Sequence, residues 1–168
     1  PRVTPTITDG LVVALGAEGD LMVLSADTGK LKWHINIPKK FGVETPMWGF
    51  AAHPLVTNNM VITMVGGPGQ AVVAFNRDSG EVVWKTMRMT GVQRAPGDSY
   101  ITPIFRQANG RTELIVAGGT WLDAYAPETG KQLWVVKGLK GNELARNPVA
   151  AGDLIFIGAV FSLYVGSW

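Results

Sequence analysis

The stretch Ala26-Asp27-Thr28-Gly29-Lys30-Leu31-Lys32-Trp33 decides the fold of this chain. Related stretches occur at residues 76–84 (NRDSGEVVW) and 126–134 (APETGKQLW). In each copy an acidic residue precedes a hydroxyl residue and a glycine, and a tryptophan follows after three further residues. The tryptophans lie about fifty residues apart, and self-similarity at that period predicts a repeat architecture.

Each copy has the chemistry of a tight turn between two strands. Acidic and hydroxyl side chains bond the turn backbone, and glycine adopts the positive φ that other residues resist. An apolar run precedes each turn, and after the first copy Leu31, Trp33, Ile35 and Ile37 alternate with polar residues. Each copy is therefore predicted to be a β-hairpin with a tryptophan on its second strand.

A second marker recurs with a similar spacing. Thr4-Pro5, His53-Pro54, Thr102-Pro103 and Asn147-Pro148 each open a short apolar segment. Proline suits the first residues of a strand because it cannot donate to a ladder of hydrogen bonds. We therefore expect first strands at residues 3–7, 52–56, 100–105 and 148–150, each followed by a turn, a second strand and a Gly-rich link.

Four strands in series with short links form antiparallel sheets, since parallel pairs need long crossovers. The prediction is an all-β chain, with three full blades of a β-propeller and the start of a fourth. The expected blades span about residues 1–38, 50–88, 99–138 and 146–168, within a single partial propeller domain. No segment shows helical periodicity, and the stretches 38–49, 88–98 and 138–146 are expected to be irregular loops.

Composition agrees with a turn-rich β protein and excludes several classes of function. The 168 residues include 21 glycines and 10 prolines, 46% are apolar, and the net charge is only +2. Nucleic-acid binding would need a clustered cationic face, and the sequence has no basic block, so this function is disfavoured. Cysteine is absent, which excludes disulfides and Cys metal sites, and no apolar run reaches the length of a membrane helix.

The repeat resembles that of pyrroloquinoline-quinone (PQQ)-type propellers, Ala-x-Asp-x-x-Thr-Gly-Lys-x-x-Trp. Residues 26–33 match it with a shorter Asp-to-Thr spacing, residues 126–134 match with Glu for Asp, and residues 76–84 match loosely. The resemblance is to the PQQ-like repeat proteins of the bacterial envelope, both periplasmic and secreted. It implies that the tryptophans dock on the turn of a neighbouring blade. The docking residues it implies are Asp27, Thr28, Gly29, Trp33, Asp78, Gly80, Trp84, Thr129, Gly130 and Trp134.

Propellers of this family close with seven or eight blades, so three and a half blades leave two sheet faces bare. Bare apolar faces of that size are partner surfaces. The chain begins without Met and ends within an apolar run, which is typical of a piece of a longer protein. Either further blades of a parent propeller or a second copy of the chain are the expected partners.

Residues with binding chemistry gather on one predicted face. Connections between blades and links between second and third strands emerge on the same side of such a sheet. That side is expected to carry ligand or partner contacts, with no catalytic residue and no metal ligand assigned. The candidates are Trp48, His53, Arg94, Asp98, Trp121, Arg146 and Asn147. Tyr100 lies there too; it and Trp48 have the alternative role of sealing blade joints, and His53 that of packing.

Two functions from different classes remain open. The first is a non-catalytic scaffold for proteins or ligands, with no cofactor; a glycan or small ligand could occupy the same face. The second is part of a PQQ-dependent dehydrogenase, which would need PQQ and Ca²⁺. Calcium takes six or more oxygen ligands, and the acids Glu18, Asp20, Glu44, Asp98 and Glu143 are scattered in the sequence. The scaffold is the preferred prediction, and an enzyme the less favoured one.

Overall fold

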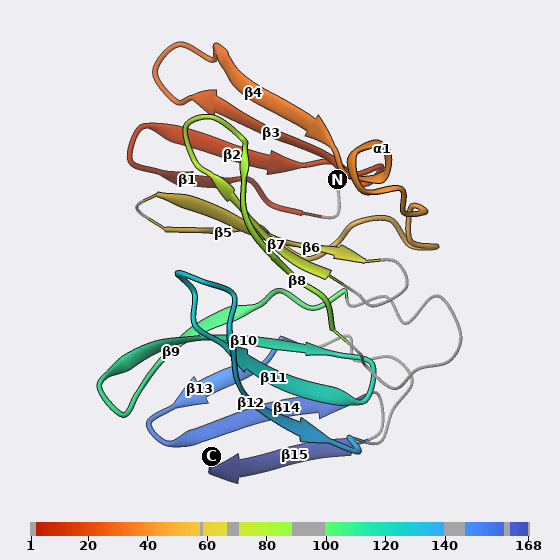
Figure 1. Cartoon of the computed structure of the whole chain (residues 1–168), viewed down its shortest axis with the longest axis vertical. Helices are drawn as coiled ribbons and strands as arrows, with labels where there is room; N and C mark the ends of the chain where they lie inside the picture. Colours follow the sequence, from red (N-terminus) through yellow and green to blue (C-terminus); the bar gives the residue numbers. More distant parts are fainter. Residues whose placement is uncertain are drawn as a thin grey trace.

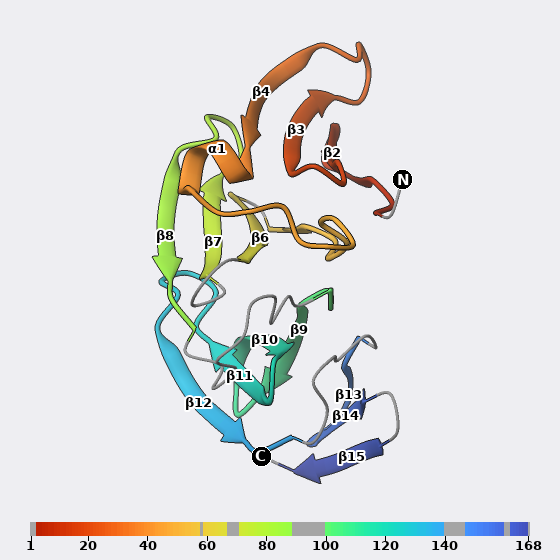
Figure 2. The same cartoon turned by 90° about the vertical axis from the view of Figure 1, so that its right-hand side faces the viewer.

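A computed structural model of the chain describes residues 3–57, 59–66, 71–88, 100–139, 147–159 and 162–167, with the backbone alone for 159 and 162–167. The strands form four antiparallel sheets, each built from strands consecutive in sequence. Figure 2 shows the sheets following one another along an arc, with β4, β8 and β12 on its outer side. This confirms the predicted propeller, with three complete blades and a fourth that has three strands in the described part of the chain.

The strands of the four blades are as follows. Blade 1 contains β1 (Thr6–Thr8), β2 (Leu11–Leu15), β3 (Asp20–Ser25) and β4 (Leu31–Asn36); blade 2 contains β5 (Leu55–Val56), β6 (Met60–Gly66), β7 (Ala71–Asn76) and β8 (Val82–Thr86). Blade 3 contains β9 (Ile104–Ala108), β10 (Arg111–Gly118), β11 (Trp121–Tyr125) and β12 (Gln132–Lys137); blade 4 contains β13 (Val149–Ala151), β14 (Leu154–Ala159) and β15 (Ser162–Ser167).

The repeat is kept at the level of single residues. The residue after each marker proline pairs with the middle of the second strand: Thr6 with Val13, Leu55 with Ile62, Ile104 with Ile115 and Val149 with Phe156. First strands nevertheless begin later than expected, at Thr6, Leu55, Ile104 and Val149. The prolines therefore lie just before the strands, because proline has no N–H for the ladder.

One five-residue helix, α1 (Ile37–Phe41), corrects the expectation of an irregular stretch at 38–49. Asn36 caps its N-terminus by accepting from the Lys39 N–H, Pro38 lies in the first turn, and Gly42 ends it with φ +65°. These are ordinary helix start and stop signals. A helix this short buries only Ile37 and so leaves no apolar periodicity in the sequence.

The alternation after the first turn also needs correction. Trp33 pairs with Val23, but Leu31 pairs with Leu24, so the strand carries a β-bulge at Lys32. Because a bulge inserts one residue, it places Leu31 on the face opposite to Trp33, where Leu31 is 57% exposed. The same one-residue shift precedes Trp84 and Trp134.

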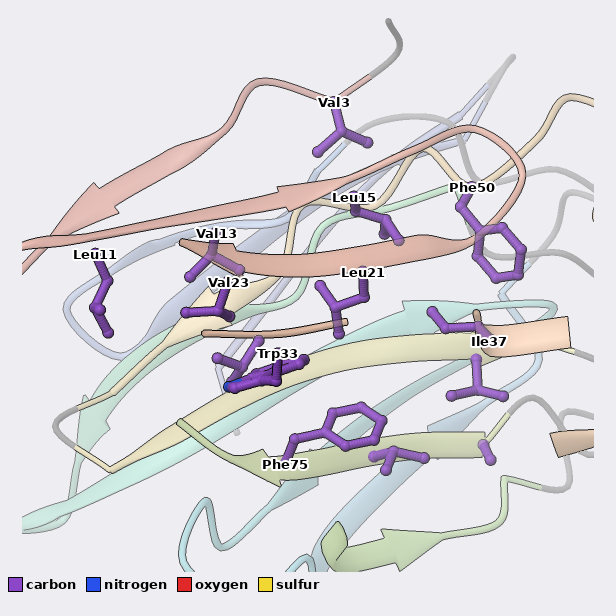
Figure 3. Packing of buried hydrophobic residues seen from close by; sticks show 14 residues of the cluster. Val3, Leu11, Val13, Leu15, Leu21, Val23, Trp33, Ile37, Phe50 and Phe75 are labelled. Atoms are coloured by element: carbon purple, nitrogen blue, oxygen red, sulfur yellow. The ribbon is translucent and has the colours of Figure 1, made fainter. Parts of the chain in front are cut away.

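Apolar side chains fill the space between successive blades. Between blades 1 and 2, Trp33 and Phe75 pack together with ring centroids 6.2 Å apart, within the cluster shown in Figure 3. Two further clusters lie between blades 2 and 3 and between blades 3 and 4. Such sheet-on-sheet burial is the main stabilising term in a repeat fold, since each unit covers its neighbour.

Two tryptophans reach across to the turn of the next blade. The Trp33 indole N–H donates to the Arg77 carbonyl at 2.7 Å, and the Trp84 indole N–H donates to the Pro127 carbonyl at 2.9 Å. Their rings lie against Gly80 and Gly130, where a Cβ would come within 2.8 and 2.5 Å of indole atoms. Trp134 differs, because its indole donates to the Glu113 carboxylate of its own blade at 3.2 Å.

Alanine at Gly80, under the Trp33 ring, and at Gly29, where a Cβ would meet nothing within 4 Å, should reveal the indole contact as a difference in stability. Gly29→Ala should lower the free energy of unfolding by about 1–2 kcal/mol, the cost of a left-handed L-residue. Gly80→Ala should lower it by roughly 1–3 kcal/mol more, because its Cβ meets the Trp33 ring. Urea unfolding of both variants measures this, and equal losses would show that the Trp33 ring does not cover Gly80.

Candidate functional site

The described connection from blade 1 to blade 2, which contains α1, lies on one side of the arc, and the tight turns between described strands lie on the other. In Figure 1 the turns between β1 and β2, β3 and β4, and β9 and β10 are at the left, whereas α1 and the link between β10 and β11 are at the right. This follows from antiparallel strands in series. We call the side with α1 the loop face.

A β-turn at residues 46–49 presents two large apolar side chains on the loop face. The Gly49 N–H donates to the Pro46 carbonyl at 2.7 Å, which closes the turn. Met47 and Trp48 occupy its tip, and they are 73% and 54% exposed. We call this pair the Met47–Trp48 tip.

The backbone beneath the tip is fixed to two blades. The Phe50 N–H donates to the Ala17 carbonyl of blade 1 at 2.9 Å, and Gly49, at φ +72°, lies so close that a Cβ would be 2.9 Å from that oxygen. The Trp48 N–H donates to the Tyr100 hydroxyl, before blade 3, at 3.4 Å. The exposed side chains therefore stand on an anchored backbone.

A polar network supports α1 next to this turn. Asn36 caps α1 and also donates through Nδ2 to the Asp20 carboxylate at 3.1 Å. The His34 ring lies 2.9 Å from the same carboxylate oxygen. The hydrogen bond from Asn36, followed by that with His34, holds the pKa of Asp20 below its ordinary value.

Removing the Asn36 amide should therefore raise the pKa of Asp20. Asn36→Ser keeps an N-cap oxygen for α1 but removes the amide donor. Because the folded-state pKa is depressed, this network contributes stability above the unfolded pKa, and the contribution is lost as pH falls through the folded pKa. A carbon-detected NMR titration of the Asp20 carboxyl should give a higher pKa in the variant; an unchanged value would exclude Asn36 as the main cause.

The residues before the marker prolines form a chain of hydrogen bonds between blades. The His53 N–H donates to Thr102 Oγ1 at 3.0 Å, and the Thr102 N–H donates to Asn147 Oδ1 at 2.9 Å. Two predicted binding residues, His53 and Asn147, are thus linked through Thr102. The Asn147 amide oxygen is occupied by this structural bond, whereas the half-buried His53 takes part through its backbone alone.

The other predicted binding residues are placed differently. Trp121 is half-buried, and the Lys137 ammonium lies 4.5 Å from the centroid of its ring, a cation–π contact within blade 3. Arg94, Asp98 and Arg146 lie outside the described residues. Sequence reasoning missed Met47, although a proline and a glycine three residues apart, Pro46 and Gly49, are a turn signal that would have placed it at a tip.

A buried ion pair joins the end of blade 2 to blade 3. Arg88 Nε donates to Asp123 Oδ2 at 2.9 Å, and Gln132 donates to the other carboxylate oxygen at 2.9 Å. The Arg88 and Asp123 side chains are 0% and 1% exposed. Burial, followed by the Asp123 charge, raises the pKa of nearby Tyr125 to about 12. The pair ties Arg88, the second residue after β8, to the middle of β11.

Breaking this pair on one side should be costly. Asp123→Ala leaves the Arg88 guanidinium buried without its counter-charge and should lower the free energy of unfolding by about 3–5 kcal/mol. The double variant Arg88→Met/Asp123→Leu removes both charges and should lose less than the single variant. Urea unfolding compares them; a single variant as stable as the parent would contradict a buried, coupled pair.

The fit of a metal-dependent cofactor can be tested on the described residues. No group of three or more His, Cys, Asp or Glu among them could hold a metal ion. Glu18 and Glu44 are exposed, and the Asp123 and Glu113 carboxylates are bound by arginines. The described acids therefore do not fit a calcium site, and no reaction step is assigned to them. In the same part of the chain, no helix is long and apolar enough to cross a membrane.

Comparison with known families identifies the repeat. The sequence profile described as outer membrane protein assembly factor BamB, of the PQQ-like repeat group, matches residues 1–165. The chain belongs to this BamB-like family. The match confirms the resemblance found in the repeats. Among proteins with curated descriptions, none matches the sequence.

Solved structures share the fold at low sequence identity. BamB from Moraxella catarrhalis superposes with a TM-score of 0.68 at 17% identity, over 99% of this chain and 46% of that one. The quinohemoprotein alcohol dehydrogenase ADHIIG from Pseudomonas putida HK5 gives 0.59 at 18%, over 93% and 28%. The computationally designed Ika4 protein gives 0.59 at 13%, over 99% and 89%. The chain thus spans less than half the length of either of these two natural proteins.

Proposed function

We propose that this BamB-like chain is a non-catalytic scaffold that docks another protein on its loop face, through the Met47–Trp48 tip. The observation that carries the proposal is an exposed Trp–Met pair on an anchored turn. Trp48 is 54% exposed, whereas Trp33 and Trp84, which face the next blade, are 8% and 9% exposed. Leaving an indole in solvent is less favourable in free energy than burying it in a blade joint. The exposure of Trp48 therefore favours a partner surface over the alternative role of sealing a blade joint.

The chemistry of the tip suits a protein partner. Tryptophan is enriched among the residues that dominate binding energy, and methionine is enriched at interfaces. The three backbone contacts of Trp48, Gly49 and Phe50 hold the turn before any partner arrives. Such preorganisation reduces the entropy lost on binding.

The family gives the proposal its setting. The BamB-like family, whose profile is described as an outer membrane protein assembly factor, is associated with the bacterial envelope, and this association supports the proposed location. We propose a periplasmic or secreted location for this chain, with further blades of a parent propeller or a second copy as neighbours. In this account Trp33 and Trp84 act as docking tryptophans between blades. His53, Asn147 and Trp121 shape the loop face but are secondary to the tip, because Asn147 and Trp121 already contact other residues of the chain.

A photocrosslinker at the tip tests the docking surface. Benzoylphenylalanine at position 48 should capture a discrete protein in cells that express the chain, and Met47→Glu should reduce that product severalfold. Unchanged circular dichroism would show that the fold is intact. The matched control is the same crosslinker at position 31, since Leu31 is 57% exposed but lies beside a tight turn on the opposite side. The same product at both positions, or none at position 48, would contradict docking at the tip.

The alternative is part of a quinoprotein dehydrogenase, and it rests on the fold shared with ADHIIG. When bound, PQQ with Ca²⁺ would supply the oxidation of an alcohol or sugar. The scaffold proposal expects no quinone absorbance to stay with the chain after incubation with PQQ and Ca²⁺ and desalting. Stoichiometric retention would favour the enzyme. A glycan on the loop face is less favoured, because Lys137 already lies over the Trp121 ring.

A further inference from the structure

The six methionines of the chain differ in how far solvent reaches them. Met47, at the tip of the turn at residues 46–49, is 73% exposed, and Met87, just after β8, is 54% exposed. Met60 and Met64, on β6, are each 4% exposed. The other two are Met22, which is half-buried, and Met89, which lies outside the described residues. A reagent in solution therefore reaches the side chain of Met47 more readily than that of any other described methionine.

The two methionines on β6 are protected by a blade joint. Met60 and Met64 belong to the apolar cluster between blades 2 and 3, together with Trp84 and Leu114. Close-packed interiors have few voids larger than a water molecule, so a solute reaches these two sulfurs only when the blades separate. The folded chain thus contains its own internal reference for an unreactive methionine.

Met47 differs because its side chain takes no part in the hydrogen bonds that hold the tip. The Gly49 N–H donates to the Pro46 carbonyl at 2.7 Å, and the Phe50 N–H donates to the Ala17 carbonyl at 2.9 Å. All four groups belong to the backbone of other residues. A change at the Met47 sulfur therefore alters the chemistry of the exposed surface and leaves the turn beneath it intact.

We propose that Met47 is a modification site, at which a peroxide oxidises the thioether to methionine sulfoxide and so prevents docking at the Met47–Trp48 tip. A lone pair of the sulfur attacks one peroxide oxygen, and the S–O bond forms as the O–O bond breaks. The sulfur loses two electrons and the departing oxygen gains them. With hydrogen peroxide, that oxygen takes up the proton of the transferred oxygen and leaves as water. Methionine sulfoxide reductases reverse this modification.

The loss of docking rests on the proposed function. Sulfoxide formation converts a flexible apolar side chain into a polar one and disrupts interfaces that contain methionine. In a docked tip the new oxygen is removed from water beside the Trp48 indole, and burying an acceptor without a partner disfavours binding. The modification itself does not depend on docking, since it requires only the exposure of Met47.

Peptide mass spectrometry of the folded chain in dilute hydrogen peroxide tests the modification site. Met47 should be oxidised within about threefold of its rate in the urea-unfolded chain, whereas Met60 and Met64 should be slowed at least about tenfold by folding. In urea the three rates should converge. A Met47 rate as low as that of Met60 in the folded chain would overturn the proposal.

Two leucine variants, Met47→Leu and Met87→Leu, test the effect on docking. Each carries benzoylphenylalanine at position 48, is treated with hydrogen peroxide, is freed of it, and is irradiated with an extract of the expressing cells. Peroxide should reduce the captured product severalfold in Met87→Leu, where Met47 is oxidised, and methionine sulfoxide reductase should restore it. Peroxide should leave the product unchanged in Met47→Leu, which keeps an apolar side chain that peroxide does not oxidise.

The possible failures are distinguishable. Equal losses in the two variants, or no loss in Met87→Leu, would overturn the effect assigned to the sulfoxide at Met47. Capture that is absent even from the untreated chain would contradict docking at the tip, and with it any effect on docking. The oxidation rates of the folded chain would then still establish or exclude the modification site.

Discussion

The contact between an indole and a glycine turn of the next blade is the interaction on which the rest of the structure depends. The Trp33 ring lies over Gly80, and its N–H reaches the Arg77 carbonyl; Trp84 repeats both contacts at Gly130 and Pro127. A side chain on the glycine would exclude the ring, and a φ near +70° excludes most other residues there. Turn chemistry and inter-blade packing therefore constrain the same position, which explains why the motif can be read from the sequence.

The β-bulge before each tryptophan is part of this arrangement. The bulge directs the tryptophan toward the next blade and the residue two positions earlier toward the opposite face. Leu31 before Trp33 and Val82 before Trp84 are therefore exposed on the outer strands. Side chains along the strands of each blade then point alternately toward the preceding blade and toward the following one. The buried pair of Arg88 and Asp123 and the chain from His53 through Thr102 to Asn147 add polar links between blades. These links between blades support the loop face. Hydrogen bonds to Ala17 in blade 1 and to Tyr100 before blade 3 hold the backbone of the Met47–Trp48 tip.

The fold was predictable because short motifs specify it locally. The site was harder to predict because its contacts join residues that are far apart in the sequence. The Asp-Thr-Gly turn and the recurring prolines each specify a short structure by their own geometry, and their period of about fifty residues gave the propeller. The bulge at Lys32 depends on pairing with β3, which an alternating pattern does not reveal. Helix α1 is too short for periodicity, although Asn36, Pro38 and Gly42 are its start and stop signals. The sequence placed Trp48 on the loop face but did not show its anchoring, because Ala17 and Tyr100 are distant in the chain. Membership of the BamB-like family came from the profile match over the whole repeat and not from any single residue.

The most direct test of the central contact is a nuclear Overhauser experiment on the folded chain. Cross-peaks from the indole protons of Trp33 to the α-protons of Gly80, and from those of Trp84 to Gly130, are predicted, with none from any indole to Gly29. Absence of the first two cross-peaks in a folded sample, or a cross-peak between Gly29 and an indole of the same molecule, would contradict blades joined by tryptophan and glycine.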